Sequence, residues 1–165
     1  MKFLNTPDYV RFATPLGPML AAATGYGLCG LWFDGQRHQP DIATWHLAPA
    51  HPLLQQTAAF MDAYFAGSTA PFSLPLDLAG GTPFQQAVWR ALLQIPRGAT
   101  TSYAALSQAV GRPTAVRAVA GAVGRNPVSV LVPCHRVLGS DGSLTGYAGG
   151  LERKTALLQL EGVLI

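Results

Sequence analysis

Short apolar runs alternate with turn residues in the first third of the chain. Three of them have the length of strands: YVRFAT (9–14), PMLAAAT (18–24) and GYGLCGLWFDG (25–35). Such runs predict a small antiparallel sheet. In LLQQTAAFMDAYFAG (53–67) the apolar residues recur at helical spacing and Gly67 closes the pattern, so a helix should follow the sheet.

The stretch LPLDLAGGTP (74–83) contains proline and glycine and is the best candidate for a linker. Beyond it the pattern becomes helical. Thr82 is a good cap residue, Pro83 suits the first helical position, and Gln85 completes a capping box. These residues predict a helix that runs to about Ile95 and is ended by the proline and glycine that follow.

Two shorter helices come next. One is predicted from Ser102 or Tyr103 to Val110 and the other from about Thr114 to Val123, with the break GRP between them. Two short helices across a tight turn are typical of a helix-turn-helix. The final predicted helix, GGLERKTALLQLEG, is stopped by its last glycine. The chain should therefore have an α/β fold in two parts, residues 1–79 and residues 80–165.

The second of the two short helices has an unusual pattern. Four of its residues recur at helical spacing and should face the core: Val116, Val119, Ala120 and Val123. The opposite face then consists mostly of small residues: Thr114, Arg117, Ala118 and Gly121. Ala122 lies near this face. A face this bare suits close approach to something narrow, such as a DNA minor groove roughly 6 Å wide. Tight packing against another helix explains it equally well.

Composition and charge narrow the class of protein. With 165 residues, of which 49% are hydrophobic, the chain can form a packed core. No uncharged apolar run reaches the roughly 18 residues of a membrane span, and MKFLNTPDYVRF lacks the apolar centre of a signal peptide, so we expect a cytoplasmic protein. Residues 1–81 carry a net charge of −2 and residues 82–165 one of +5. The basic half is consistent with a polyanionic partner, although the number alone favours ordinary surface charge.

The cysteines and histidines give little support for a metal. Two cysteines cannot form a disulfide framework or a four-cysteine zinc site, and Cys29 lies in an apolar run where burial is expected. Three of the four histidines are scattered without metal-ligand spacing: His38, His46 and His51. We predict no metal and no cofactor.

The strongest candidate chemistry is the sequence PCHR, which ends the apolar run of NPVSVLVPCHRVLGSDG. A thiolate is favoured by neighbouring cationic groups, so Cys134 is a candidate nucleophile and His135 a candidate base. Glu161 could orient His135, although the sequence alone favours a solvated acid at a helix end. Asn126 could hydrogen-bond the loop before Cys134, or it could be a simple turn residue.

The chain from about Thr82 to Gly162 resembles the O6-alkylguanine-DNA alkyltransferases, also called methylated-DNA–protein-cysteine methyltransferases. The resemblance rests on PCHRV, followed at the family's spacing by GYAGG and the terminal EG. The first half is similar to the family's small first domain only in length and element order. This resemblance implies a sheet-plus-helix N-terminal domain and a mostly helical C-terminal domain with a winged helix-turn-helix.

The resemblance also implies an activity: direct reversal of DNA damage. The alkyl group of O6-alkylguanine, and of O4-alkylthymine, would move to Cys134 once per molecule, after the nucleotide is flipped out of the duplex. His135 would deprotonate Cys134 through a water, Glu161 would orient His135, and Asn126 would hold the loop. The partner would be double-stranded DNA carrying alkylated bases, and the protein would be a monomer.

Further roles follow from the same resemblance. Arg117 would enter the base stack from a helix docked in the minor groove, whose face includes Thr114, Ala118 and Gly121. Tyr103 would contact the rotated phosphate and the flipped base. The guanine pocket would be lined by four residues: Val137, Tyr147, Ala148 and Gly149.

The sequence differs from the family pattern at two points, and two other functions are possible alternatives. Ser129 stands where several relatives have proline. The zinc ligands of the animal members' first domain are not evident in this sequence, so we predict no structural zinc. One alternative is a binding-only alkyltransferase-like damage sensor, but such relatives replace the acceptor cysteine and Cys134 is present. The other is a Cys-His hydrolase, which would leave the bare helix face and the basic half unexplained.

Overall fold

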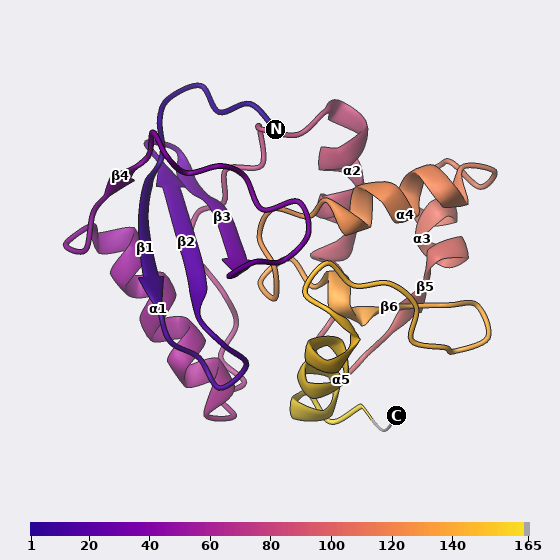
Figure 1. The fold of residues 1–165 in the computed structure, drawn as a ribbon. Helices are drawn as coiled ribbons and strands as arrows, with labels where there is room; N and C mark the ends of the chain where they lie inside the picture. Colours follow the sequence, from indigo (N-terminus) through magenta and orange to yellow (C-terminus); the bar gives the residue numbers. More distant parts are fainter. Residues whose placement is uncertain (164–165) are drawn as a thin grey trace.

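The N-terminal region of the computed structural model, which describes residues 1–163, is built on a four-stranded sheet (Figure 1). Its strands are β1 (Asp8–Phe12), β2 (Met19–Thr24), β3 (Gly27–Phe33) and β4 (His46–Leu47). They lie in the order β3-β2-β1-β4, and the three longer strands are antiparallel, as predicted. β4 pairs in parallel with β1. The sequence did not predict this strand, because its two residues are both exposed and show no alternation of apolar and polar positions.

Helix α1 (Pro52–Phe65) covers one face of the sheet and contacts β1, β2 and β3. Its buried side chains form one stripe at intervals of three or four residues: Leu54, Thr57, Met61 and Tyr64. Gly67 follows with a φ of +95°, a conformation that favours glycine at the end of a helix. Cys29 is buried on the opposite face of the sheet beside Trp32, which confirms its expected place in the core.

The predicted linker packs along the edge of the sheet. Leu28 N donates to Pro75 O at 2.8 Å and Asp77 N donates to Leu28 O at 2.8 Å, so this stretch extends the free side of β3. Leu78 is buried in the main core. That core also contains residues of both regions, such as Leu31 and Val128, and the two regions therefore pack as one body.

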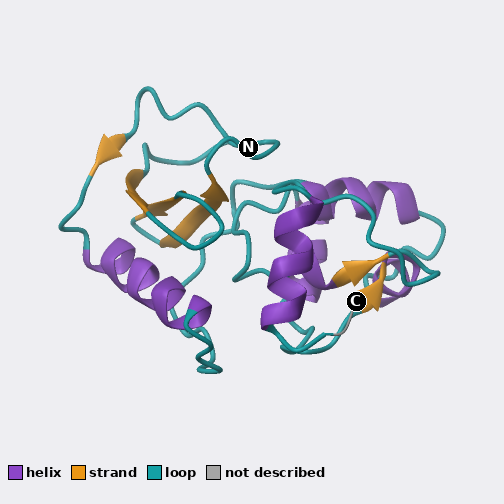
Figure 2. Ribbon diagram, turned by 60° about the horizontal axis from the view of Figure 1, so that its bottom comes forward, coloured by secondary structure: helices purple, strands orange, loops and turns teal. Residues whose placement is uncertain are grey.

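The C-terminal region is mostly helical (Figure 2). Its helices are α2 (Pro83–Leu92), α3 (Tyr103–Ala109), α4 (Val116–Gly124) and α5 (Leu151–Leu160). The capping box of Thr82 and Gln85 is present. α2 ends before Ile95, because Ile95 N donates to the carbonyl of Leu92, three residues back, in a tighter turn. This arrangement confirms the predicted fold class of a sheet-plus-helix region followed by a helical region.

The expected helix-turn-helix is formed by α3 and α4, which pack against each other and against α2. The sequence placed Thr114 on the exposed face of this helix. α4 begins only at Val116, so Thr114 lies in the turn before the helix. Two short strands, β5 (Thr101–Ser102) and β6 (Val137–Leu138), pair in parallel and fix the loop beyond β6 beside α3 as a wing. Within residues 1–163 no helix is long and apolar enough to cross a membrane.

Candidate active site

Cys134 opens a single 3-10 turn, Cys134–Arg136, at the end of a loop organised by Asn126. The Asn126 amide nitrogen donates to Val132 O at 2.7 Å and to Cys134 Sγ at 3.0 Å, while its oxygen accepts from Val128 N at 3.0 Å. Asn126 therefore holds both the loop and the sulfur atom. It is a hydrogen-bonding residue of the loop and not a simple turn residue.

The loop between these residues is strained. Val130 has a φ of +72°, which is rare for a β-branched residue, and it is buried. Backbone bonds from β3 hold the preceding segment: Leu31 N donates to Pro127 O at 2.8 Å, and Ser129 N donates to Leu31 O at 2.8 Å. Ser129 Oγ also lies 3.2 Å from Gln36 Oε1. The N-terminal region thus fixes the backbone that carries Cys134.

The thiol of Cys134 is almost fully buried. Burial raises its pKa, while the hydrogen bond from Asn126 and the positive charge of Lys154 act in the opposite direction. Cys29 lacks such partners: burial and the charge of Asp77 raise its pKa to about 12. Of the two cysteines, Cys134 is therefore the one with partners that stabilise a thiolate once a base removes its proton, whereas its burial acts against ionisation.

His135 is completely buried and its Nε2 lies 2.9 Å from Glu161 Oε1. Burial lowers the pKa of His135, although Glu161 acts in the opposite direction, so the imidazole is neutral at rest. A neutral ring that donates from Nε2 has its lone pair on Nδ1. Nδ1 has no hydrogen-bond partner among residues 1–163, which leaves it able to accept a proton.

Glu161 lies at the end of α5 and its side chain is inaccessible to solvent. Arg136 donates to both carboxylate oxygens at 2.8 Å, and Tyr64 Oη donates to Oε1 at 2.8 Å. Burial alone would raise the pKa of Glu161, but the hydrogen bonds from Arg136 and His135 and their charges hold it far below its usual range. The solvated helix-end acid that the sequence alone favoured is wrong.

Lys154 is a buried cation that sequence reasoning missed. Its Nζ donates to Val137 O at 2.6 Å and to Thr145 O at 3.1 Å, and so joins α5 to the wing. Burial lowers its pKa to about 8. The signal was present, because Lys154 precedes Leu157, Leu158 and Glu161 by three, four and seven residues and therefore shares their buried face.

A pocket of about 500 Å³ opens above Cys134. Five further expected site residues line it: Tyr103, Arg117, Gly121, Tyr147 and Ala148. Thr114, Ala118, Val137 and Gly149 are not among the lining residues. Val137 is buried and Thr114 and Ala118 are exposed. Tyr103 Oη donates to Thr145 O at 3.2 Å, which ties α3 to the pocket wall.

The expected core face of α4 is partly wrong. Val116 and Ala120 are half-exposed and line the pocket, whereas Ala122 is buried and its carbonyl accepts from Trp89 Nε1 at 2.8 Å. The helix is rotated from the expected orientation because one side of it borders a cavity. Arg117 and Ala118 remain exposed, so tight helix packing does not explain the bare face.

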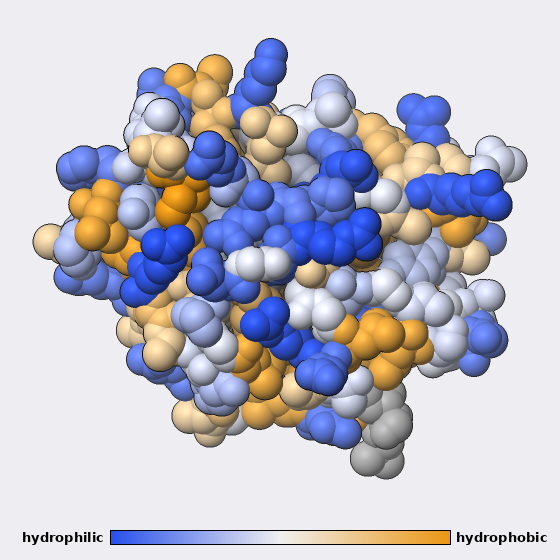
Figure 3. Space-filling model, in the orientation of Figure 1, coloured by the Kyte–Doolittle hydropathy of each residue, from blue (hydrophilic) through white to orange (hydrophobic). Residues whose placement is uncertain are grey.

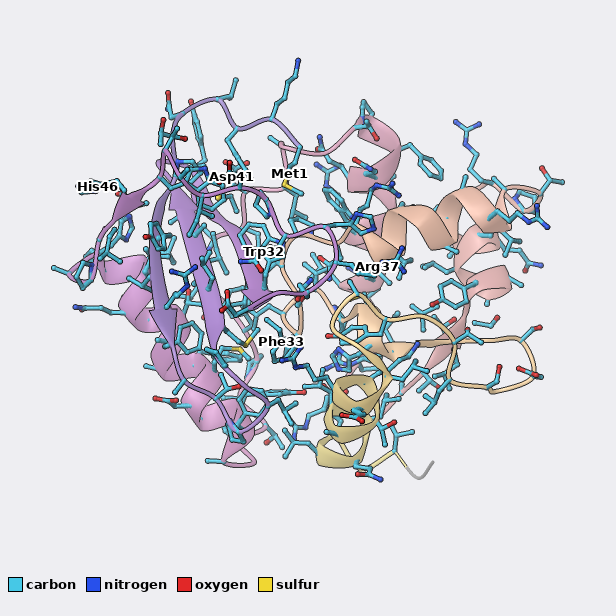
Figure 4. The ribbon with its side chains drawn as sticks, viewed as in Figure 1. Met1, Trp32, Phe33, Arg37, Asp41 and His46 are labelled. Atoms are coloured by element: carbon cyan, nitrogen blue, oxygen red, sulfur yellow. The ribbon has the colours of Figure 1, made fainter. Side chains whose placement is uncertain are left out.

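The N-terminal region supplies one wall of the pocket through Arg37 and His38, which the sequence did not single out for this role. Arg37 lies between the sheet and the C-terminal region, whereas His46 lies far from it (Figure 4). Burial, Arg125 and Arg37 lower the pKa of His38. Hydrophilic side chains gather along this junction (Figure 3).

Comparison with known proteins identifies the family. Residues 83–163 match the DNA-binding domain of 6-O-methylguanine DNA methyltransferase, and residues 9–78 match its ribonuclease-like domain. The chain belongs to the 6-O-methylguanine DNA methyltransferase family. Methylated-DNA–protein-cysteine methyltransferase of Mycobacterium leprae is 46% identical over 90% of this chain and 88% of that protein. The Haemophilus influenzae protein of the same name is 41% identical over 94% and 86%.

Solved structures of this family have the same fold. The structure of Mycobacterium tuberculosis OGT in complex with DNA has a TM-score of 0.86 and 44% sequence identity, covering 93% of this chain and 92% of that one. The resemblance found in PCHRV and GYAGG is confirmed. Within residues 1–163, no group of three or more His, Cys, Asp or Glu could hold a metal ion.

Proposed function

We propose that this 6-O-methylguanine DNA methyltransferase repairs alkylated DNA by taking the alkyl group of O6-alkylguanine onto Cys134. The observation that carries this proposal is the position of Cys134 below the pocket, with Asn126 on its sulfur and the His135–Glu161 pair beside it. The relatives named methylated-DNA–protein-cysteine methyltransferase support the same activity.

The reaction begins with a proton transfer. Cys134 gives its proton, through a water, to Nδ1 of His135, and Glu161 stabilises the imidazolium that forms. The thiolate attacks the alkyl carbon, a C–S bond forms, and the C–O bond breaks with its electron pair passing to the guanine. The guanine then takes up a proton from water, His135 returns to water the proton that it accepted, and a thioether remains on Cys134.

A buried sulfur cannot reach a base inside a duplex, so the damaged nucleotide must be flipped out. Arg117, on the exposed side of α4, enters the stack behind it, while Thr114, Ala118 and Gly121 lie against the minor groove. The flipped base would then occupy the pocket that Tyr103, Tyr147 and Ala148 line, whereas Val137 and Gly149, which were also expected there, do not line it. O4-alkylthymine fits the same chemistry.

We place the boundary between an N-terminal domain (1–79) and a C-terminal DNA-binding and acceptor domain (80–165) in the stretch that packs along β3. The protein acts as a monomer in the cytoplasm on double-stranded DNA, without a cofactor. The presence of Cys134 disfavours a binding-only damage sensor, and the exposed bare face of α4 disfavours a Cys-His hydrolase.

One experiment separates these functions. The protein is incubated with an oligonucleotide containing O6-methylguanine, and the intact masses of protein and DNA are measured. Repair adds one methyl group to the protein and removes it from the DNA; a sensor binds the DNA and changes neither mass; a hydrolase without a nucleic-acid role does not bind. Cys134→Ser should retain duplex binding within a few-fold and gain no mass.

A further inference from the structure

The N-terminal region contacts the candidate site through β3, through the segment that follows it and through α1. Leu31 in β3 exchanges backbone hydrogen bonds with the loop before Cys134, and Arg37 N donates to Ala148 O at 3.0 Å in the pocket wall. The contact from α1 is a side-chain hydrogen bond of 2.8 Å from Tyr64 Oη to Glu161 Oε1. Among residues 1–163, this is the hydrogen bond by which the N-terminal region reaches the acid–base pair.

Tyr64 is held firmly where it meets Glu161. It lies in the last turn of α1, is 6% exposed, and its ring packs edge-on against Phe65 with centroids 5.3 Å apart. The guanidinium of Arg97 lies 5.2 Å from the centre of the ring. Arg97 itself donates to Ser68 O and to Leu160 O, both at 3.1 Å, and so joins the end of α1 to the end of α5.

We propose that Tyr64 is a positioning residue through which the N-terminal region sets the acid–base balance of the His135–Glu161 pair. The proposal deepens the alkyl-transfer function above and rests on it. Oxygen Oε1 of Glu161 accepts three hydrogen bonds at once, from Tyr64, from His135 and from Arg136. Each donor draws on the same negative charge, so the bond from Tyr64 weakens the attraction between Glu161 and the His135 imidazolium.

The other charged or titratable groups around the pair come from the C-terminal region. They are Arg136, Lys154, Arg97, Tyr147, Tyr103 and Cys134. Burial and the charge of Glu161 raise the pKa of Tyr64, so its hydroxyl remains a donor throughout the working pH range. Tyr64 is therefore a constant influence from α1, whereas His135 and Cys134 change protonation during the reaction.

Tyr64→Phe removes the hydroxyl and keeps the ring. Glu161 then becomes a stronger acceptor for His135, the pKa of His135 rises, and Cys134 loses its proton at a lower pH. We expect the midpoint of the pH–rate profile for methyl transfer to move down by about half a unit. A role in packing alone would lower the amount of active protein without moving the midpoint.

The test measures the pKa of His135 directly, by NMR titration of protein labelled with ¹⁵N-histidine, beside single-turnover rates on methylated duplex DNA. Tyr26→Phe, which removes one exposed hydroxyl from the same region, is the matched control and should change neither value. An unchanged or lowered His135 pKa in Tyr64→Phe overturns the proposal. The NMR result does not depend on methyl transfer, so failure of the proposed function is recognised separately, by absence of transfer in the parent protein.

A second variant guards against loss of folding. Replacement of Tyr64 by 3-fluorotyrosine keeps the shape of the ring and makes the hydroxyl a stronger donor. The His135 pKa should then fall and the rate profile should move to higher pH, opposite to the effect of phenylalanine. Shifts of the same sign in both variants overturn the proposal.

Discussion

At the scale of single residues, Glu161 connects chemistry to structure. Its partners Tyr64, His135 and Arg136 lie 97, 26 and 25 positions away along the chain. Local sequence pattern predicts a helix end at Glu161 but contains no information about partners so distant. PCHR and its neighbours therefore revealed Cys134 and His135, whereas Tyr64 became visible only when the fold brought it to the site.

Glu161→Gln should slow methyl transfer about tenfold near neutral pH and allow recovery at alkaline pH. The amide stabilises the His135 imidazolium poorly, so the thiolate of Cys134 forms only when the pH is raised by about one unit. Single-turnover rates between pH 6 and pH 10 measure the shift. Glu152→Gln, which removes an exposed charge from the same helix, is the control and should leave the profile unchanged. An unaltered profile in Glu161→Gln would remove Glu161 from the proton transfer.

The same carboxylate should make stability depend on pH. Because the pKa of Glu161 is lowered in the folded state, its contribution is fully present above the unfolded value of about 4.3 and is lost as the pH falls toward the folded value. Glu161→Gln should reduce the free energy of unfolding by about 3 kcal/mol at neutral pH, since Arg136 loses its charged partner. Urea unfolding of both proteins should show this difference shrinking below about pH 4. A difference that stays constant into acid would assign the loss to packing.

At the scale of elements, prediction succeeded where the signal is local. The three apolar runs became β1, β2 and β3, and the capping box of Thr82 and Gln85 starts α2. Prediction failed where the structure of an element depends on a contact with residues distant in the sequence. The pairing of β4 depends on β1, and the orientation of α4 depends on the pocket that borders Val116 and Ala120. Helical periodicity cannot distinguish a buried face from one that lines a cavity.

The bare face of α4 should lose its fit to DNA when one of its small residues is enlarged. Ala118→Leu adds a larger side chain to an exposed position, where substitutions usually change stability by less than about 0.5 kcal/mol. It should nevertheless weaken binding to duplex DNA about tenfold, because the added bulk keeps α4 out of a groove only about 6 Å wide. Fluorescence anisotropy measures the affinity. Ala59→Leu, at an exposed position of α1, is the matched control. Equal affinities for both variants would place the DNA elsewhere.

At the scale of the whole molecule, the two regions act as one unit. β3 pairs on its outer side with the stretch around Leu76 and with the segment around Val128, and a single apolar core includes side chains of both regions. The strained loop at Val130 is thereby held between Asn126 and the sheet. An addition to Cys134 is made inside this packed body, so its effects should extend beyond the sulfur.

The molecule should react once. Transfer to Cys134 leaves a thioether, which has no carbonyl for water to attack, unlike the acyl intermediate of a hydrolase. The second thiol, Cys29, cannot remove the alkyl group from Cys134, because it is buried in β3 and its pKa is raised to about 12. Repaired lesions should therefore level off at one per active chain, with the added methyl group in the peptide that contains Cys134, as measured by intact-protein and peptide mass spectrometry. Continued repair beyond one lesion per chain, or a methyl group on another residue, would show that Cys134 is not the final acceptor.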